Sequence, residues 1–318
     1  MLLLRPIWQN SMQGVVIKST GSWYRVRLSD GELVDCRLKG KFRIKGLRST
    51  NPVAVGDEVT VEQVDETYAI TTIAERKNYL VRKSTNLSKQ IHILAANVDQ
   101  VLLITSIVQP RVPTGLIDRI LVAAEAYGIP AIIVFNKFDL CDEEDIDLVA
   151  ERMATYDPIG YKCIVTSVES GKGIKAVKEQ LIGKTTLLTG QSGVGKSSLI
   201  NAVEPLLDLK TGDVSTFNEK GQHTTTFAEM HPLSFGGDII DTPGVRSFGM
   251  IDFEKEHLSH YFPEMRALLG ECKFNNCVHV NEPGCVVKAA VEEGEISDRR
   301  YQSYLNLYFD EDLEKDYD

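Results

Sequence analysis

The chain has 318 residues, of which 43% are hydrophobic and 25% are charged, the proportions of an ordinary globular protein with room for two or three domains. Its apolar runs are shorter than the roughly 20 residues that a membrane span requires, so we expect no membrane segment. The opening MLLLRPIWQN has neither a basic region nor a small-residue cleavage site. We therefore expect no signal peptide and a cytoplasmic location.

The net charge of −10 is distributed unevenly. Residues 1–90 hold 15 Lys and Arg against 9 Asp and Glu, a net +6, so the remainder carries −16. A basic N-terminal region on an acidic protein is typical of a local contact with a polyanion. A solvated surface would produce the same pattern, so charge alone does not separate the two interpretations.

The first part of the chain reads as a small β-domain. Turn signals separate short segments rich in Val, Ile, Tyr and Thr, which predict strands. These segments are Gly14–Ser19, Trp23–Leu28, Leu33–Leu38, Glu58–Val64 and Tyr68–Ile73. Five short strands favour a small barrel of the OB-fold type.

A basic loop joins the third and fourth of these strands. Its sequence, KGKFRIKGLR, places Phe42 among the cations Lys39, Lys41, Arg43, Lys45 and Arg48. Such a loop suits a nucleic-acid backbone, with an aromatic ring available for stacking on a base. An ordinary exposed connection is the alternative.

From about residue 97, strands and helices alternate. The predicted strands are Val98–Ile107, Ala131–Phe135, Tyr161–Thr166 and Thr185–Thr189, and the predicted helices are Leu116–Tyr127, Asp142–Thr155, Ile174–Leu181 and Lys196–Val203. This alternation predicts a parallel sheet with helices on both faces. A smaller, mostly helical region with clustered cysteines follows, and we place the domain bounds at 1–82, 83–249 and 250–318. The acidic tail Asp310–Asp318 is expected to be a frayed terminus.

The segment GQSGVGKS fits the phosphate-loop pattern at every fixed position. It comprises Gly190, Gln191, Ser192, Gly193, Val194, Gly195, Lys196 and Ser197, and it lies between a predicted strand and a predicted helix. Glycines let backbone N–H groups surround phosphates, and the helix directs its positive end at them. Lys196 would neutralise phosphate charge as a catalytic group, Ser197 would bind Mg²⁺, and Ser198 would adjoin the nucleotide. A chance glycine-rich turn is the alternative.

The tetrapeptide Asn136-Lys137-Phe138-Asp139 follows a predicted strand and indicates guanine recognition. The Asp139 carboxylate can accept hydrogen bonds from the ring N–H and exocyclic amine of guanine, whereas adenine would leave it unpaired. Lys137 would pack along the base. Ser167 follows the next strand, where GTPases make a backbone contact to the guanine oxygen, although Thr-Ser is a common pair. Asn136 and Asp139 disfavour an ATP-dependent kinase.

Two further segments suit the magnesium and γ-phosphate contacts of a GTPase. Asp241-Thr242-Pro243-Gly244 follows an apolar strand end, where Asp241 would join the Mg²⁺ shell and Gly244 would sense the γ-phosphate. A plain turn is the alternative. Upstream, GQHTTT offers a threonine for Mg²⁺, and we favour Thr225, with Thr224 and Thr226 left open. Val245 occupies the place of the usual water-orienting glutamine, so His223 is our candidate catalytic residue. A loop histidine that only contacts RNA is the alternative.

Three thiols and one imidazole lie within fourteen residues near the C-terminus: Cys272, Cys277, His279 and Cys285. A closed Cys₃His set suits tetrahedral structural zinc, one ion per chain. Three unrelated cysteines and a surface histidine are the alternative, which the clustering in a polar, turn-rich segment disfavours.

The motifs run in the order NKFD, TS, GQSGVGKS, TTT and DTPG, whereas ordinary GTPases begin with the phosphate loop. This order is a circular permutation. Together with the N-terminal barrel, DTPGVRSFG and the cysteine cluster, it resembles the RsgA (YjeQ/YloQ) family over nearly the whole chain. That family's zinc pattern, C-x4-C-x-H-x5-C, matches here without departure.

The resemblance implies an OB-fold, a permuted GTPase domain and a zinc domain in a GTPase that depends on the small ribosomal subunit. It implies GTP/GDP, Mg²⁺ and Zn²⁺ as cofactors, the 30S subunit and its 16S rRNA as partners, and a role late in 30S maturation. We expect a monomer. The alternative function is an RNA-binding module that uses GTP only as an occupancy switch, which intact Lys196, Ser197 and Asp241 disfavour.

Overall fold

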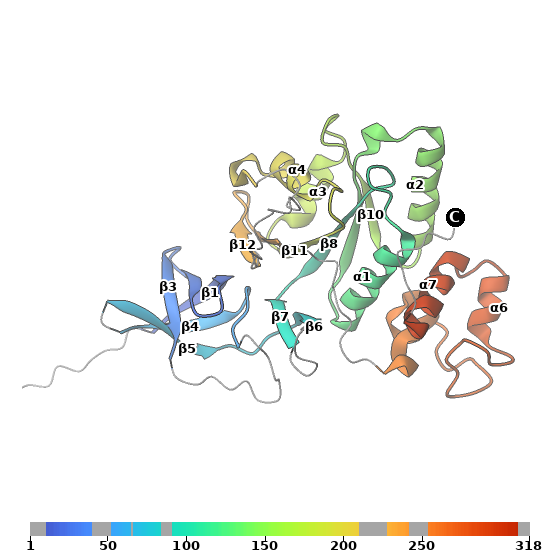
Figure 1. Cartoon of the computed structure of the whole chain (residues 1–318), viewed down its shortest axis with the longest axis horizontal. Helices are drawn as coiled ribbons and strands as arrows, with labels where there is room; N and C mark the ends of the chain where they lie inside the picture. Colours follow the sequence, from blue (N-terminus) through green and yellow to red (C-terminus); the bar gives the residue numbers. More distant parts are fainter. Residues whose placement is uncertain are drawn as a thin grey trace, which may run out of the picture.

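The computed structural model describes residues 11–39, 52–64, 66–83, 91–209, 228–241 and 254–310. Three parts follow one another along the chain: a small β-barrel, a central α/β layer structure and a helical C-terminal part (Figure 1). This is the architecture that the sequence predicts.

The barrel contains five strands: β1 Ser11–Ser19, β2 Tyr24–Leu28, β3 Leu33–Leu38, β4 Glu58–Val64 and β5 Thr67–Ile73. Their order is β1-β2-β3-β5-β4, and a β1–β4 pairing closes the barrel. Residues of β2 alternate between buried and exposed, so that Tyr24, Val26 and Leu28 enter the barrel core while Arg25 stays outside. The predicted five-stranded barrel is confirmed.

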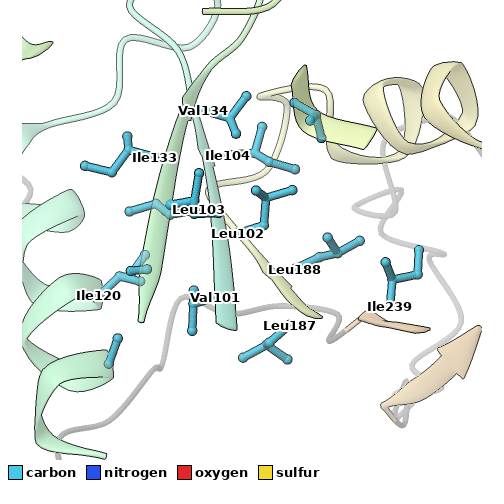
Figure 2. Packing of buried hydrophobic residues seen from close by; sticks show 14 of the residues in the cluster. Val101, Leu102, Leu103, Ile104, Ile120, Ile133, Val134, Leu187, Leu188 and Ile239 are labelled. Atoms are coloured by element: carbon cyan, nitrogen blue, oxygen red, sulfur yellow. The ribbon is translucent and has the colours of Figure 1, made fainter. Parts of the chain in front are cut away.

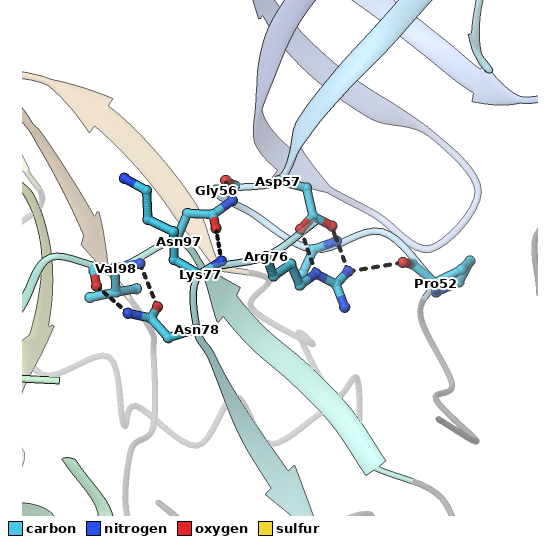
Figure 3. A network of polar contacts seen from close by, with 9 residues as sticks. Pro52, Gly56, Asp57, Arg76, Lys77, Asn78, Asn97 and Val98 are labelled. Atoms are coloured by element: carbon cyan, nitrogen blue, oxygen red, sulfur yellow. Dashed lines mark hydrogen bonds and ion pairs between the residues drawn. The ribbon is translucent and has the colours of Figure 1, made fainter. Parts of the chain in front are cut away.

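A hairpin of β6 Tyr79–Lys83 and β7 Ile91–Ala96 follows the barrel. The sequence does not predict these two strands. Polar contacts beside this hairpin join the barrel to the central part (Figure 3). Arg76 donates two 2.6 Å hydrogen bonds to the carboxylate of Asp57, which is fully buried. The Asn97 side chain donates to the Gly56 carbonyl at 2.9 Å. Because the buried Asp57 carboxylate has its charge matched by the Arg76 guanidinium, the junction is specific.

The central part alternates strands and helices as predicted. Its elements are β8 Gln100–Thr105, α1 Thr114–Ala126, β9 Ala131–Phe135, α2 Glu143–Tyr156, β10 Lys162–Val165, α3 Ile174–Leu181, β11 Thr185–Thr189, α4 Lys196–Val203, β12 Glu229–Pro232 and β13 Asp238–Asp241, with short 3₁₀ turns at Phe138–Leu140 and Pro205–Leu207. Helices α1 and α2 cover one face of the sheet, and α3 and α4 cover the other (Figure 1). Buried aliphatic side chains of β8, β9 and β11, including Leu102 and Leu103, fill the space between these layers (Figure 2).

The strand order β10-β9-β8-β11-β13-β12 determines where a ligand can bind. The chain runs outward from β8 to β10 and then crosses to β11 on the other side of β8. This reversal is a topological switch point, and open α/β sheets bind ligands at the carboxyl ends of the strands beside it. The phosphate loop follows β11 and Asn136 follows β9, so both lie at that edge.

Strand β12 is antiparallel to its neighbours and also pairs with β1, so the barrel and the central part share one eleven-stranded sheet. This pairing covers what would otherwise be an exposed sheet edge.

The described residues of the C-terminal part form a 3₁₀ helix, Lys255–Tyr261, and three helices: α5 Pro263–Arg266, α6 Val286–Glu292 and α7 Asp298–Phe309. It has its own apolar core, which Val122 of α1 enters from the central part. Within the described ranges, no helix is both long and apolar enough to cross a membrane.

Candidate functional site

The phosphate loop requires its glycines because other parts of the sheet approach its backbone closely. Gly190 has φ 145°, and a Cβ there would lie 2.1 Å from the carbonyl oxygen of Ile104. Gly195 has φ 88°, and a Cβ there would lie 2.7 Å from Nδ2 of Asn136. A side chain at either position would therefore displace backbone of β8 or the guanine motif.

Lys196 begins α4 and directs its ammonium group back over the loop. Its Nζ donates to the carbonyls of Gly190 at 2.9 Å and Gln191 at 3.0 Å. Burial lowers the pKa of Lys196, and the nearby Asp241 carboxylate opposes that shift. Ser197 and Ser198 follow in the first turn of the helix, both half-buried. A cation and free helical N–H groups thus meet where phosphates bind in such loops.

Asn136 links the guanine motif to the phosphate loop. Its Nδ2 donates to the Val194 carbonyl at 2.9 Å, and its Oδ1 accepts a hydrogen bond from Thr166 Oγ1 at 2.9 Å. Asn136 and Thr166 are both buried. The three loops at the carboxyl ends of β9, β10 and β11 are therefore held together by one amide.

Asp139 and Ser167, which the sequence placed on separate motifs, are in direct contact. Ser167 Oγ donates to Asp139 Oδ1 at 2.5 Å and accepts a hydrogen bond from the Ser170 backbone N–H at 3.1 Å. From the sequence, only a backbone contact of Ser167 to the guanine oxygen is predicted. Lys172 makes a second contact between these two motifs, because its ammonium lies 3.6 Å from the centroid of the Phe138 ring.

Sequence reasoning missed the segment after β8. Lys137, which has φ 62°, donates from its Nζ to the backbone carbonyl of Gln109. The ring of Pro110 lies 3.4 Å from where a Cβ of Gly193 would be. No motif marks these residues, since a backbone carbonyl carries no residue-type signal.

Asp241 ends β13, which pairs directly with β11, the strand that precedes the phosphate loop. It is paired in register with Leu188 of β11 and with Glu229 of β12. The remaining predicted nucleotide and catalytic residues, Gly244, Thr225 and His223, lie outside the described residues. So do Lys41, Arg43, Lys45 and Arg48 of the basic loop.

The structure brings the four predicted zinc ligands together, with their ligand atoms all within 4.8 Å of one another. Nδ1 of His279 lies 3.6 Å from Sγ of Cys272, 3.5 Å from that of Cys277 and 3.4 Å from that of Cys285. The sulfurs of Cys272 and Cys285 are 4.0 Å apart. A tetrahedral zinc ion with ordinary bond lengths requires S···N edges of about 3.6 Å and S···S edges of about 3.8 Å. The donor set therefore fits a single tetrahedral metal ion.

The surroundings hold this donor set in place. Glu282 accepts hydrogen bonds from the backbone N–H groups of Val278 and Val280, both at 2.9 Å. Tyr301 donates from its hydroxyl to the His279 carbonyl at 2.7 Å. Burial raises the pKa of Cys277 to about 12, so a metal ion must displace thiol protons when it binds.

Comparison with known proteins places this geometry in a family. The profile of the RsgA GTPase matches residues 73–251, and that of the RsgA N-terminal domain matches residues 13–70. A Flavobacterium johnsoniae protein named small ribosomal subunit biogenesis GTPase RsgA is 54% identical over 300 residues, which are 93% of this chain and 92% of that protein. The Porphyromonas gingivalis protein of the same name is 48% identical over 310 residues, 96% of this chain and 98% of the other.

Two solved structures agree over more than nine-tenths of the chain. The crystal structure of YjeQ from Thermotoga maritima superposes with a TM-score of 0.76 at 37% identity, covering 94% of this chain and 98% of that one. YloQ, described as a circularly permuted GTPase, superposes with a TM-score of 0.73 at 33% identity, covering 96% and 97%. The permuted motif order and the sheet order described above agree with that description. The chain therefore belongs to the RsgA family and is a circularly permuted GTPase.

Proposed function

We propose that this GTPase acts in biogenesis of the small ribosomal subunit, binding the 30S particle late in its maturation and hydrolysing GTP in response. The observation that carries the proposal is the agreement of more than nine-tenths of the chain with relatives that bear this name. A location in the cytoplasm, where ribosomes assemble, and a monomeric state are parts of the same proposal.

GTP and GDP would bind along the carboxyl edge of the sheet. Asp139, oriented by Ser167, would read the guanine edge, and Lys137 would lie along the base. Gly190–Ser198 would surround the phosphates. Ser197, Asp241 and Thr225 would hold Mg²⁺, and Gly244 would contact the γ-phosphate.

Hydrolysis of GTP requires stabilisation of charge that spreads over the phosphoryl oxygens in the transition state. Lys196 is positioned for this task, since its ammonium is held over the loop by two carbonyls and can transfer those hydrogen bonds to phosphate oxygens. We assign orientation of the attacking water to His223, because Val245 can neither donate nor accept a hydrogen bond. His223→Ala should keep GTP and subunit affinity and lose stimulated turnover, whereas full stimulation in this variant would assign the water to a group of the ribosome.

The Cys₃His centre would hold one Zn²⁺ with a structural role. Its four protein ligands leave no open coordination position, which is the arrangement of structural rather than catalytic zinc. The ion would cross-link the turn around Cys272–Cys285 and so fix the surface that the C-terminal part presents to a partner.

The barrel would bind 16S rRNA. On its described surface, the Arg37 guanidinium lies 4.1 Å from the centroid of the exposed Trp23 ring. An adjoining open hollow of about 400 Å³, on the barrel rather than at the phosphate loop, is lined by Lys18, Thr20, Trp23, Arg25 and Asp35. Cations beside an exposed aromatic suit phosphates and bases. The basic loop Lys39–Arg48 would add phosphate contacts, although Lys39 also pairs with Glu62 at 2.7 Å.

The proposal is tested by measuring GTP hydrolysis with and without purified small subunits. We expect the subunits to raise the turnover rate, and binding to weaken steeply with salt. Alanine at Lys41, Arg43, Lys45 and Arg48 should flatten the salt slope. Slow turnover that subunits leave unchanged would favour the second candidate, an RNA-binding module that uses GTP as an occupancy switch.

A further inference from the structure

A row of charged residues runs across four strands, from the barrel to the nucleotide site. Arg25 of β2 is paired in register with Lys18 of β1, Lys18 with Glu229 of β12, and Glu229 with Asp241 of β13. Residues directly opposite each other on neighbouring strands direct their side chains to the same face of a sheet. Asp241 is therefore the last member of a row that begins on the barrel.

The middle of this row is an ion pair between the two parts of the protein. Lys18 Nζ lies 2.9 Å from Glu229 Oε2, with side chains 39% and 41% exposed. Such an exposed pair is weak by itself. It nevertheless joins β1 to β12 at Glu229, the residue of β12 that is paired with Asp241 of β13.

A second ion pair, better shielded, holds the other end of the β12–β13 hairpin. Arg27 of β2 donates two hydrogen bonds to Asp238, one to each carboxylate oxygen, at 2.7 and 2.8 Å. The two side chains are 25% and 17% exposed. Two parallel charge-assisted hydrogen bonds fix direction as well as distance. Asp238 begins β13 and Asp241 ends it, so the barrel holds this strand directly at its start and through Glu229 at its end.

We propose that the barrel is a positioning element of the GTPase centre: Lys18 and Arg27 hold the β12–β13 hairpin so that Asp241 is presented to Mg²⁺. The inference rests on the magnesium role proposed for Asp241. Neither barrel residue touches the nucleotide, and both act through strands of one continuous sheet.

Through this arrangement, RNA bound to the barrel affects the GTPase centre without touching it. Lys18 and Arg25 line the hollow beside Trp23, so a phosphate bound there competes with Glu229 for Lys18. A ligand that weakens the Lys18–Glu229 pair changes the position of Asp241. By thermodynamic reciprocity, Mg²⁺-GTP then changes the affinity of the barrel for that ligand.

The test uses the full-length protein without ribosomal subunits. Lys18→Ala and Arg27→Ala are compared with wild type for two Mg²⁺ concentrations: the one that gives half-maximal GTP hydrolysis, and the one that gives half of the effect of Mg²⁺ on the binding of a non-hydrolysable GTP analogue. We expect a rise of about 2- to 30-fold, the range for residues that couple sites without touching either ligand. GDP affinity measured in EDTA should be unchanged, because the phosphate loop and guanine motif are intact. Exchanging the charges in Lys18→Glu/Glu229→Lys should restore part of the Mg²⁺ affinity lost in Lys18→Ala.

Glu62→Gln is the matched control, since it breaks a Lys–Glu pair of similar length that lies entirely within the barrel. Arg27→Lys, which keeps the charge and loses the paired hydrogen bonds, provides a milder variant if Arg27→Ala folds poorly. Magnesium titrations of Lys18→Ala and Arg27→Lys that coincide with that of Glu62→Gln would overturn the proposal. Asp241→Asn is measured in parallel, because an unchanged titration there would remove the proposed magnesium role itself.

Discussion

The side-chain amide of Asn136 donates a hydrogen bond of 2.9 Å to the backbone carbonyl of Val194, tying the guanine motif to the phosphate loop. The two residues are 58 positions apart in the chain and both are buried. The segments predicted to bind the base and the phosphates therefore share one rigid support.

Asn136→Ala should lower GDP affinity by at least about tenfold and reduce stability. It leaves the Val194 carbonyl and the Thr166 hydroxyl buried without this partner, at about 1–3 kcal/mol each. Titration with a fluorescent GDP analogue and thermal unfolding measure the two effects. Asn78→Ala is the control, since Asn78 makes a similar pair of backbone hydrogen bonds to Val98, away from the nucleotide motifs. An equal loss of GDP affinity in both variants would mean that the effect of Asn136 is one of global stability.

Asp139→Asn should weaken GTP binding and shift preference toward xanthosine triphosphate. The extra carbonyl of xanthine would meet an amide donor where guanine presents its amine. The Ser167 hydroxyl, 2.5 Å from Oδ1, can still donate to the amide oxygen and orient the new side chain. Competition titrations with both nucleotides measure the shift. GTP affinity equal to that of wild type would remove Asp139 from the base site.

Purified protein should contain about one zinc ion per chain, and Cys285→Ser should lose it. Zinc binding to such centres is worth on the order of 10 kcal/mol, so its removal should unfold the turn around the ligands. Metal analysis and limited proteolysis report the two effects. Cys163→Ser should retain the zinc, because Cys163 lies on β10 outside the cluster. Wild-type protein without zinc would refute the assignment.

Arg300→Met should destabilise the protein by about 3–5 kcal/mol, because it leaves buried carboxylates without their cation. Arg300 is 1% exposed and donates at 2.7 Å to Asp118 of α1 and to Glu264 of α5. Burial lowers the pKa of Arg300, but Asp118 and Glu264 raise it well above its usual value. Urea denaturation measures the loss. Arg299→Ala, which removes an exposed pair with Glu151, should cost below about 1 kcal/mol. Similar losses in the two variants would contradict a special role for the buried pair.

Much of the fold follows from local sequence. The strands Leu33–Leu38 and Thr185–Thr189 and the helix Lys196–Val203 have the bounds that the sequence predicts. Residue types and turn signals are local properties, because they act within one short segment. The β6–β7 hairpin was missed since its connecting sequence, STNLSKQ, contains neither Gly nor Pro. The domain bounds at 82 and 249 stay predictions.

The sequence predicts the nucleotide motifs and the four metal ligands because each motif is short and its residue types follow directly from its chemistry. Only the tertiary structure decided how they are supported. Backbone carbonyls such as that of Gln109 carry no residue-type signal. The pairing of Lys18 with Glu229 joins strands 211 residues apart, and nothing within either segment specifies the other as its partner. Strand register between distant segments is a property of the folded sheet, since it depends on the packing of both parts at once.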